Sequence, residues 1–207
     1  MNNCESGAIL VLSGPSGAGK SSLIEKVTDA IGPYYFSIST TTRPMREGEI
    51  DGVHYHFVDE ATFKKEIEDE MFLEYAIVHG NYYGTSITPV KKALKEGKLV
   101  IFDIDVQGHD AVQHRLGDIT TSVFITTPTL GELERRLEAR ATDSRDVIEK
   151  RIEMAKREIQ RMSEYDFIIV NDDLDDAAQK LVTVAKAARL KVPTLEINAF
   201  VHEWETH

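Results

Sequence analysis

Short apolar runs alternate with amphipathic stretches along most of the chain, and this alternation predicts strands and helices in turn. The clearest strand is 8–12, where five apolar residues stand together as in a strand buried on both faces of a sheet. A glycine-rich turn follows, and Leu23, Ile24 and Val27 then lie on one side of a helix expected over 21–31. Strands that alternate with helices predict a parallel sheet covered by helices on both faces.

The rest of the chain continues this pattern with one interruption. Further strands are expected at 34–38, 98–105, 121–126 and 165–170, and further helices at 89–96, 111–116, 130–140, 146–161 and 174–190. The interruption, 40–84, is rich in threonine, glycine and scattered aromatics. Its alternating segment 53–58 predicts an inserted, partly antiparallel subdomain, with one helix near 60–70. After Pro193 no strong pattern is present.

Composition and charge narrow the classes of function. The chain has 207 residues, 42% of them hydrophobic, which suits one α/β domain with insertions. Its 35 acidic residues exceed its 24 basic ones, which argues against a general nucleic-acid binder but permits a small phosphorylated ligand. The single cysteine, Cys4, fits a reducing compartment, and no apolar run is long enough to span a bilayer. We therefore expect a cytoplasmic protein without membrane or nucleic-acid partners.

A glycine-rich motif follows the first strand directly. Residues 14–21 read G-P-S-G-A-G-K-S and match the phosphate-loop pattern GxxxxGK[ST]. Inward-turned N–H groups and the start of the next helix hold phosphates in such loops. Lys20 is expected to reach the β- and γ-phosphates, and the Ser21 hydroxyl to bind Mg²⁺. The predicted nucleotide-binding residues are Gly14, Pro15, Ser16, Gly17, Ala18, Gly19, Lys20, Ser21 and Ser22.

A second candidate phosphate site lies in the inserted segment. The string S-T-T-T-R-P-M-R over 39–46 places Arg43 and Arg46 beside four hydroxyls, and arginine forks grip phosphate bidentately. Taken alone, the string could equally be a solvated basic turn. Further on, Glu74 offers a carboxylate, which would select guanine over adenine by accepting from N1–H and the exocyclic amine. Tyr55 and the string G-N-Y-Y-G-T at 80–85 add aromatic rings, hydroxyls and glycines.

Two aspartates follow the apolar strand that begins at residue 98. Asp103 and Asp105 are two positions apart, so on a strand both would point to one face. Carboxylates at the end of a central strand beside a phosphate loop suit Mg²⁺-bound water or an incoming acceptor. The segment 106–108 is expected to form a tight exit from the strand. Ordinary strand-end capping is the alternative, and spacing does not say which aspartate faces the metal and which the base.

Three arginines near the junction of two predicted helices form the last candidate group. Arg136 and Arg140 are four positions apart and share a helix face, and Arg151 lies on the next helix. On residue type alone such arginines would be solvated, or paired with an acid such as Glu132 or Glu138.

Jointly, these motifs resemble guanylate kinase of the bacterial type. The phosphate loop, S-T-T-T-R-x-x-R, F-L-E, G-N-Y-Y-G-T, D-I-D-x-Q-G and V-N-D-D-L occur in the family's order between about Ile9 and Arg189. The resemblance implies a P-loop three-layer α/β fold with a central parallel sheet, an inserted mixed α+β GMP-binding subdomain and a helical lid. It implies a single domain, with its core at 8–38, 86–135 and 152–190, the GMP-binding subdomain at 39–85 and the lid at 136–151.

The resemblance also assigns roles by position. It implies that the phosphate of GMP is held by Arg43, Arg46, Tyr55 and Tyr83. It implies that the guanine is read by Ser39, Glu74 and Thr85, with help from Asp103 and Asp105. The implied catalytic residues are Lys20, Arg43, Arg136, Arg140 and Arg151. Asn171 resembles a residue near the adenine of ATP, and Ala141 departs from the glycine that relatives often carry after the lid arginine.

The implied activity is reversible transfer of the γ-phosphoryl group of MgATP to GMP, giving ADP and GDP, with Mg²⁺ as cofactor. The expected partners are the nucleotides ATP, ADP, GMP and GDP, and the oligomeric state stays open. One alternative is a kinase for another nucleoside monophosphate. A second is a non-catalytic interaction module that binds phosphopeptides, a class that tends to lose the lysine and the lid arginines present here.

Overall fold

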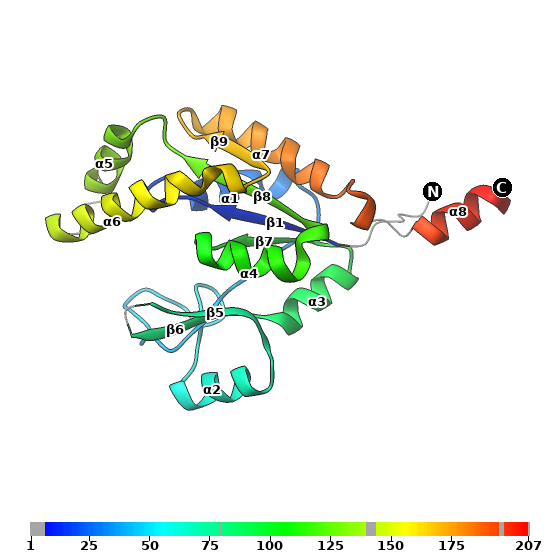
Figure 1. The fold of residues 1–207 in the computed structure, drawn as a ribbon, viewed down its shortest axis with the longest axis horizontal. Coiled ribbons are helices and arrows are strands. Elements are labelled where there is room, and N and C mark those ends of the chain that lie inside the picture. The colour runs from blue at the N-terminus through cyan, green and yellow to red at the C-terminus, as the bar shows by residue number, and fades with distance from the viewer. Residues whose placement is uncertain (1–6, 79, 140–143, 195–196, 207) are drawn as a thin grey trace.

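A five-stranded parallel sheet forms the centre of the computed structural model, which describes residues 7–78, 80–139, 144–194 and 197–206 (Figure 1). Its strand order is β2-β7-β1-β8-β9, and every neighbouring pair is parallel. In that order the strands are β2 (Tyr34–Phe36), β7 (Leu99–Asp103), β1 (Ala8–Ser13), β8 (Thr120–Thr126) and β9 (Phe167–Val170). The predicted parallel sheet is therefore confirmed.

Helices cover both faces of this sheet, as Figure 1 shows. They are α1 (Lys20–Val27) and α7 (Leu174–Ala188) on one face, and α3 (Ile87–Lys95) and α4 (Val106–Leu116) on the other. Side chains alternate along β1, so Leu10 and Leu12 enter the core under α1 and α7. Ile9 and Val11 enter the second core, under α3 and α4. Burial on both faces explains why β1 is a continuous apolar run.

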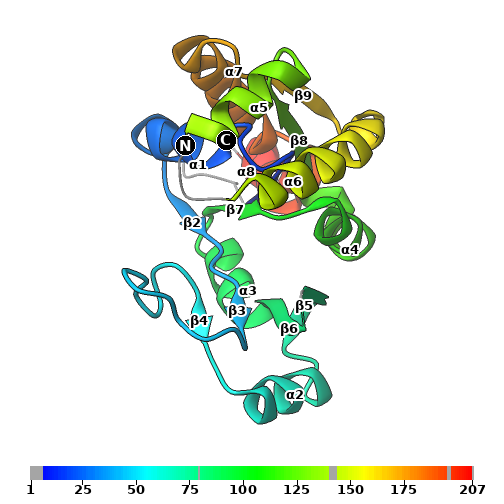
Figure 2. The same cartoon turned by 90° about the vertical axis from the view of Figure 1, so that its left-hand side faces the viewer.

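A second, four-stranded sheet lies below the central one (Figure 2). Its order is β4-β3-β6-β5, with β3 and β4 parallel and the other pairs antiparallel. Its elements are β3 (Thr40–Thr41), β4 (His56–Phe57), β5 (Phe72–Val78), β6 (Asn81–Ser86) and the helix α2 (Glu60–Glu68). Phe63 of α2 stacks on Phe72 of β5 with ring centroids 4.3 Å apart and fastens the helix to the sheet. This mixed unit is the inserted subdomain that the sequence predicted.

Two further helices pack beside the phosphate loop. They are α5 (Leu130–Ala139) and α6 (Arg145–Glu158), joined by a small core of Leu133, Leu137, Ile148 and Ala155. Among the described residues, short 3₁₀ helices lie at η1 (Thr28–Ala30), η2 (Gly117–Ile119), η3 (Ile159–Glu164) and η4 (Val192–Thr194).

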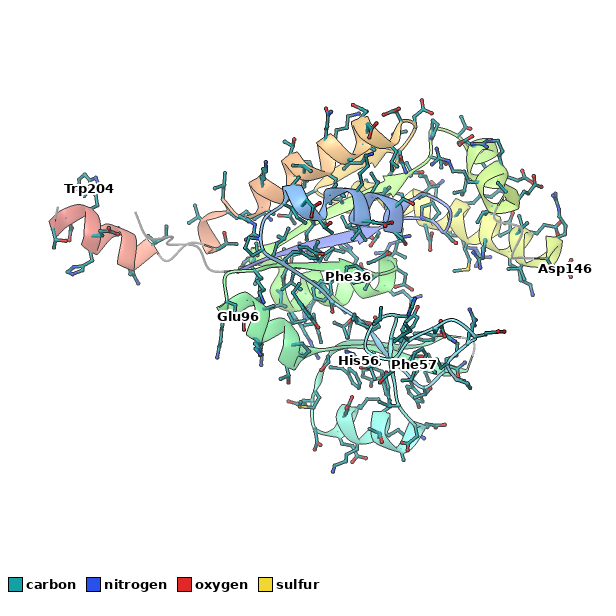
Figure 3. The ribbon with its side chains drawn as sticks, turned by 180° about the vertical axis from the view of Figure 1, so that it is seen from behind. Phe36, His56, Phe57, Glu96, Asp146 and Trp204 are labelled. Carbon is teal, nitrogen blue, oxygen red and sulfur yellow. The ribbon has the colours of Figure 1, made fainter. Side chains whose placement is uncertain are left out.

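The last helix, α8 (Ile197–Thr206), lies at one end of the structure (Figure 1). Its Trp204 is 75% exposed and stands clear of the rest of the molecule in Figure 3. The sequence shows no strong pattern after Pro193, and the helix over 197–206 was not expected from it. No helix in the part of the chain that the structure describes is long and apolar enough to cross a membrane.

The region after β7 also differs from expectation. A strand over 98–105 is wrong, because β7 ends at Asp103. The segment 106–108 is not a loop, and the helix expected at 111–116 begins at Val106. The reason is a cap: the Asp105 carboxylate accepts from the N–H groups of Gln107 at 3.0 Å and Gly108 at 2.8 Å. Most other boundaries moved by one to three residues, and the helix expected over 21–31 ends as α1 at Val27 and continues as η1.

Candidate active site

The phosphate loop connects β1 directly to α1, as the motif predicts. Gly14 has φ of 138° and lies against β8, where a Cβ would overlap the backbone oxygen of Ile125. Gly19 has φ of 91°, and a Cβ there would overlap the side-chain amide of Asn171. Glycine is thus required at both positions, and together they bend the backbone into a loop at the start of α1.

Lys20 places its ammonium group inside this loop. Its Nζ donates to the backbone oxygen of Gly14 at 2.7 Å and lies 3.8 Å from Oδ1 of Asp103. Its side chain is 16% exposed, so the charge is held close to the loop rather than spread into solvent. Burial raises the pKa of the Asp103 carboxyl, and the charge of Lys20 offsets only part of that rise. The lysine and the aspartate therefore form one charged pair beside the space above the loop.

A cavity of about 290 Å³ opens over the phosphate loop. It is lined by Gly14, Ser16, Gly17, Gly19, Lys20, Ser21, Asp103, Ile104, Asp105 and Glu158. The described residues contain no cluster of three or more His, Cys, Asp or Glu side chains that could cage a metal. One hydroxyl with nearby carboxylates instead fits Mg²⁺, which keeps several waters and binds through one or two protein groups and the substrate's phosphates.

A second cavity of about 340 Å³ lies between the two sheets. It is lined by Ser39, Tyr55, Glu74, Ala76, Tyr83, Asp103, Ile104, Asp105 and Gly108. Six of these were singled out in the sequence, from five separate stretches of chain. The segment 103–105 lines both this cavity and the one over the phosphate loop. The end of β7 is therefore the wall that the two cavities share.

Glu74 and Thr85 face each other across β5 and β6. The Thr85 hydroxyl donates to Oε1 of Glu74 at 2.6 Å. Burial raises the pKa of the Glu74 carboxyl, and the Thr85 hydrogen bond opposes that rise. One carboxylate oxygen is thus fixed by the threonine, and the carboxylate as a whole lines the cavity between the sheets.

The two arginines of the inserted segment are placed differently. The guanidinium of Arg43 packs against the rings of Tyr55, 5.4 Å from Cζ to the centroid, and Phe57, at 5.6 Å. Phe57 is labelled in Figure 3, on β4 among the side chains of the second sheet. Arg46 is exposed, and its guanidinium does not line the cavity between the sheets. Neither arginine lines the cavity between the sheets, but Arg43 packs against Tyr55, which does.

The three arginines expected to form a lid also have different surroundings. Nε of Arg136 donates to Oε1 of Glu132 at 2.6 Å, the acid pairing expected from residue type alone. Hydrogen bonds from Arg135, which has the larger effect, and from Arg136 lower the pKa of the Glu132 carboxyl to about 2. Arg151 reaches the phosphate loop, where Nη1 donates to the Ser16 hydroxyl at 2.9 Å. Arg140 and Ala141 lie outside the described residues.

Comparisons with known proteins agree with this geometry. A guanylate kinase family model matches residues 6–188 of the chain. The chain belongs to the guanylate kinase family. Curated guanylate kinases from Sulfurimonas denitrificans and Wolinella succinogenes are 73% and 51% identical to it, over 98% and 97% of this chain and 98% and 93% of theirs. A crystal structure of guanylate kinase from Anaplasma phagocytophilum superposes with a TM-score of 0.74 at 29% identity, covering 92% of this chain and 90% of that one.

Within this guanylate kinase fold, Asn171 lies beneath the phosphate loop. Its Nδ2 donates to the backbone oxygen of Ala18 at 2.8 Å, and its own N–H donates to the oxygen of Thr126 at 2.7 Å. The residue is buried but also lines a third cavity of about 380 Å³ with Ser22, Arg135 and Arg136. The structure thus gives Asn171 a supporting contact in addition to a place beside a cavity.

Replacing Asn171 with alanine is expected to lower the free energy of unfolding by about 1–3 kcal/mol, because the buried Ala18 oxygen loses its partner. Urea unfolding of Asn171→Ala beside Gln179→Ala, which removes an exposed amide from α7, measures this. Unfolding like the wild type, with a higher KM for ATP, would instead assign the side chain to the adenine.

Two carboxylates that the sequence did not single out lie at these sites. Glu158, at the end of α6, lines the phosphate cavity, and burial raises its pKa. It stands in a helix with charges at most positions, so no sequence pattern distinguishes it. Glu49 contacts Arg43 and follows Arg46 by three positions. Its place in the same turn as the two arginines was the one available signal.

Proposed function

We propose that this chain transfers the γ-phosphoryl group of MgATP to GMP, giving ADP and GDP. One observation carries the proposal: the cavity over the phosphate loop and the cavity holding Glu74 share the wall 103–105. A donor on the loop and an acceptor on Glu74 would meet at that wall. Membership of the guanylate kinase family supports GMP as the acceptor.

Catalysis rests on positioning and on neutralising charge. The phosphate of GMP is already an anion near neutral pH, so the reaction needs no strong general base. Lys20 would contact the β- and γ-phosphates, and Arg43, Arg136, Arg140 and Arg151 would balance charge on the transferring group. When bound, Mg²⁺ supplies further positive charge, and the Ser21 hydroxyl with Asp103 or Asp105, through water, would hold it.

The proposed substrate sites follow the two cavities. Residues 39–85 would form the GMP-binding subdomain: Arg43, Arg46, Tyr55 and Tyr83 would bind the phosphate, and Ser39, Glu74 and Thr85 the guanine. Residues 136–151 would form a lid, and the hydrogen bond from Arg151 to Ser16 supports its reach to the loop. Closure of both parts would exclude water, which otherwise would hydrolyse ATP without transfer.

The activity would recycle GMP and supply GDP, the precursor of GTP. We propose a cytoplasmic setting, where both nucleotides are present. The partners would be the nucleotides ATP, ADP, GMP and GDP.

We expect ADP to form from MgATP in the presence of GMP, and not with AMP, UMP or dTMP as acceptor. The reason is the Glu74 carboxylate, which accepts from the two donors on the guanine edge. A coupled ADP assay with the four acceptors, and one without acceptor, measures this. ADP formation without regard to acceptor would mean a nucleotide hydrolase. GMP binding without turnover would favour the non-catalytic interaction module.

A further inference from the structure

Glu49 holds the two arginines of the inserted segment in one turn. Its Oε2 accepts from Nη1 of Arg43 at 3.0 Å, and its Oε1 accepts from Nη2 at 2.6 Å. The same Oε2 accepts from the backbone N–H of Arg46 at 2.7 Å, while the Glu49 N–H donates to the Arg46 oxygen at 3.1 Å. The Arg43 and Glu49 side chains are only 12% and 16% exposed. One carboxylate therefore joins the side chain of Arg43 to the backbone of Arg46.

This contact leaves part of Arg43 available. A guanidinium has five N–H donors, and here Nη1 uses two, on Glu49 and on the Pro44 oxygen at 2.7 Å. Nη2 uses one on Glu49. Glu49 and Pro44 do not use Nε–H or the second Nη2–H, which together form the side fork that matches two oxygens of a phosphate. Tyr83, which lines the cavity between the sheets, hydrogen-bonds the Arg43 side chain and, like Glu49, raises its pKa.

The remaining degrees of freedom of the guanidinium are limited by aromatic rings. Tyr55 and Phe57 lie 5.4 and 5.6 Å from Cζ, and the Tyr55 ring meets Tyr83 at 5.9 Å between centroids. A flexible arginine loses rotamer freedom when it binds a ligand, and a side chain already held in place loses less. Glu49 fixes the orientation of the guanidinium through hydrogen bonds, and the aromatic rings hold its position by packing.

We propose that Glu49 is a positioning residue for the acceptor phosphate: it holds Arg43 and the 43–46 turn in the geometry that receives the phosphate of GMP. This inference rests on the proposed function. Arg43 lowers the pKa of the Glu49 carboxyl to about 2, so the carboxylate stays charged throughout the range in which the enzyme would be assayed.

If Glu49 instead competed with the phosphate for Arg43, its removal would have the opposite effect on GMP binding. A carboxylate on an arginine can also compete with an incoming phosphate, and its removal would then strengthen GMP binding. Glu49 does not use the side fork of Arg43, and this argues against competition, because Glu49 and a phosphate can use different N–H groups. Removal of the Glu49 charge is therefore expected to weaken GMP binding.

The test is steady-state kinetics of Glu49→Gln with two matched controls. We expect the KM for GMP to rise about 10- to 100-fold, as for loss of hydrogen bonds to a charged group, with the KM for ATP unchanged. Glu47→Gln makes the same charge change at an exposed position of the same turn. Asp51→Asn weakens a carboxylate that accepts from the Phe57 N–H at 2.8 Å and does not contact Arg43. Both controls should keep the wild-type KM for GMP.

A second measurement separates positioning from a general loosening of the loop. Glu49→Gln should weaken binding of GMP but not of guanosine, which lacks the phosphate, and in an Arg43→Ala background its effect on GMP should be much smaller than in the wild type. An unchanged or lower KM for GMP, or equal weakening of guanosine, would overturn the role of Glu49. Absence of GMP turnover in the wild type would instead overturn the proposed function, so the two failures are distinguishable.

Discussion

Lys20→Met is expected to lower kcat for GMP phosphorylation on the order of 10²-fold or more, while the protein stays folded. The ammonium group is held 2.7 Å from the Gly14 oxygen, at the floor of the cavity where the phosphates of ATP would lie. Methionine keeps most of the apolar stem and removes only the charge. Since negative charge on the transferring group is spread over oxygens, a fixed cation there acts most strongly in the transition state.

The matched control is Lys26→Met on the same helix. Lys26 pairs with Asp175 at the surface and is far more exposed than Lys20, at 42% against 16%. Its removal should change kcat less than twofold, because exposed ion pairs contribute little. Circular dichroism melting of both variants and a coupled ADP assay complete the measurement. Near-normal turnover of Lys20→Met would contradict the assignment of the phosphate loop.

The fold could be predicted largely from local signals. An apolar strand, a glycine loop and a one-sided helix specify a parallel unit, and each such unit appears in the central sheet. The expected bounds after β7 were wrong because a single side-chain contact decides them, and the helix at 197–206 was not expected at all. Asp105 lies two positions after Asp103, which reads as strand alternation, yet its carboxylate caps α4 and ends the strand earlier. The sequence alone does not distinguish an aspartate that caps a helix from an aspartate that belongs to a strand.

The candidate site divides in the same way. Ser39, Tyr55, Glu74 and Tyr83 belong to separate motifs and line one cavity, because β3 to β6 form one sheet. The sequence only suggests the register of that sheet. The sequence specifies charge pairing only in part. The pairing of Arg136 with Glu132 was expected, whereas the pairing of Arg43 with Glu49 and the place of Glu158 at the cavity over the phosphate loop were not. Glu49 and Glu158 are two of 35 acidic residues, and only the packed chain places them at these sites.

Glu74→Gln is expected to lower kcat/KM for GMP by about 10²- to 10⁴-fold, because two hydrogen bonds to a charged group are worth about 1.5–3 kcal/mol each. The glutamine amide also turns a donor toward the donors of guanine. ATP binding should be unchanged, since among the described cavities Glu74 lines only the one between the two sheets. A KM for ATP that rises in parallel would mean that the change acts through the fold rather than through the base.

The pH dependence of guanine recognition and of stability gives a second test of Glu74. Burial raises the pKa of the Glu74 carboxyl above its ordinary 4.5, so guanine recognition should be lost on the acid side at a higher pH than for an exposed glutamate. The sign for stability is opposite: a raised pKa means that the ionised carboxyl costs free energy in the folded state, and this cost disappears only as pH falls through the pKa.

Glu74→Gln carries no such charge and can keep the Thr85 hydrogen bond. At pH 7.5 its melting temperature should therefore equal or exceed that of the wild type, even though GMP is no longer used efficiently. Thermal melts of both proteins between about pH 5 and 8, beside kcat/KM for GMP at each pH, measure the two signs together. A variant that melts well below the wild type at pH 7.5 would show that the Glu74 carboxylate supports the fold rather than the substrate.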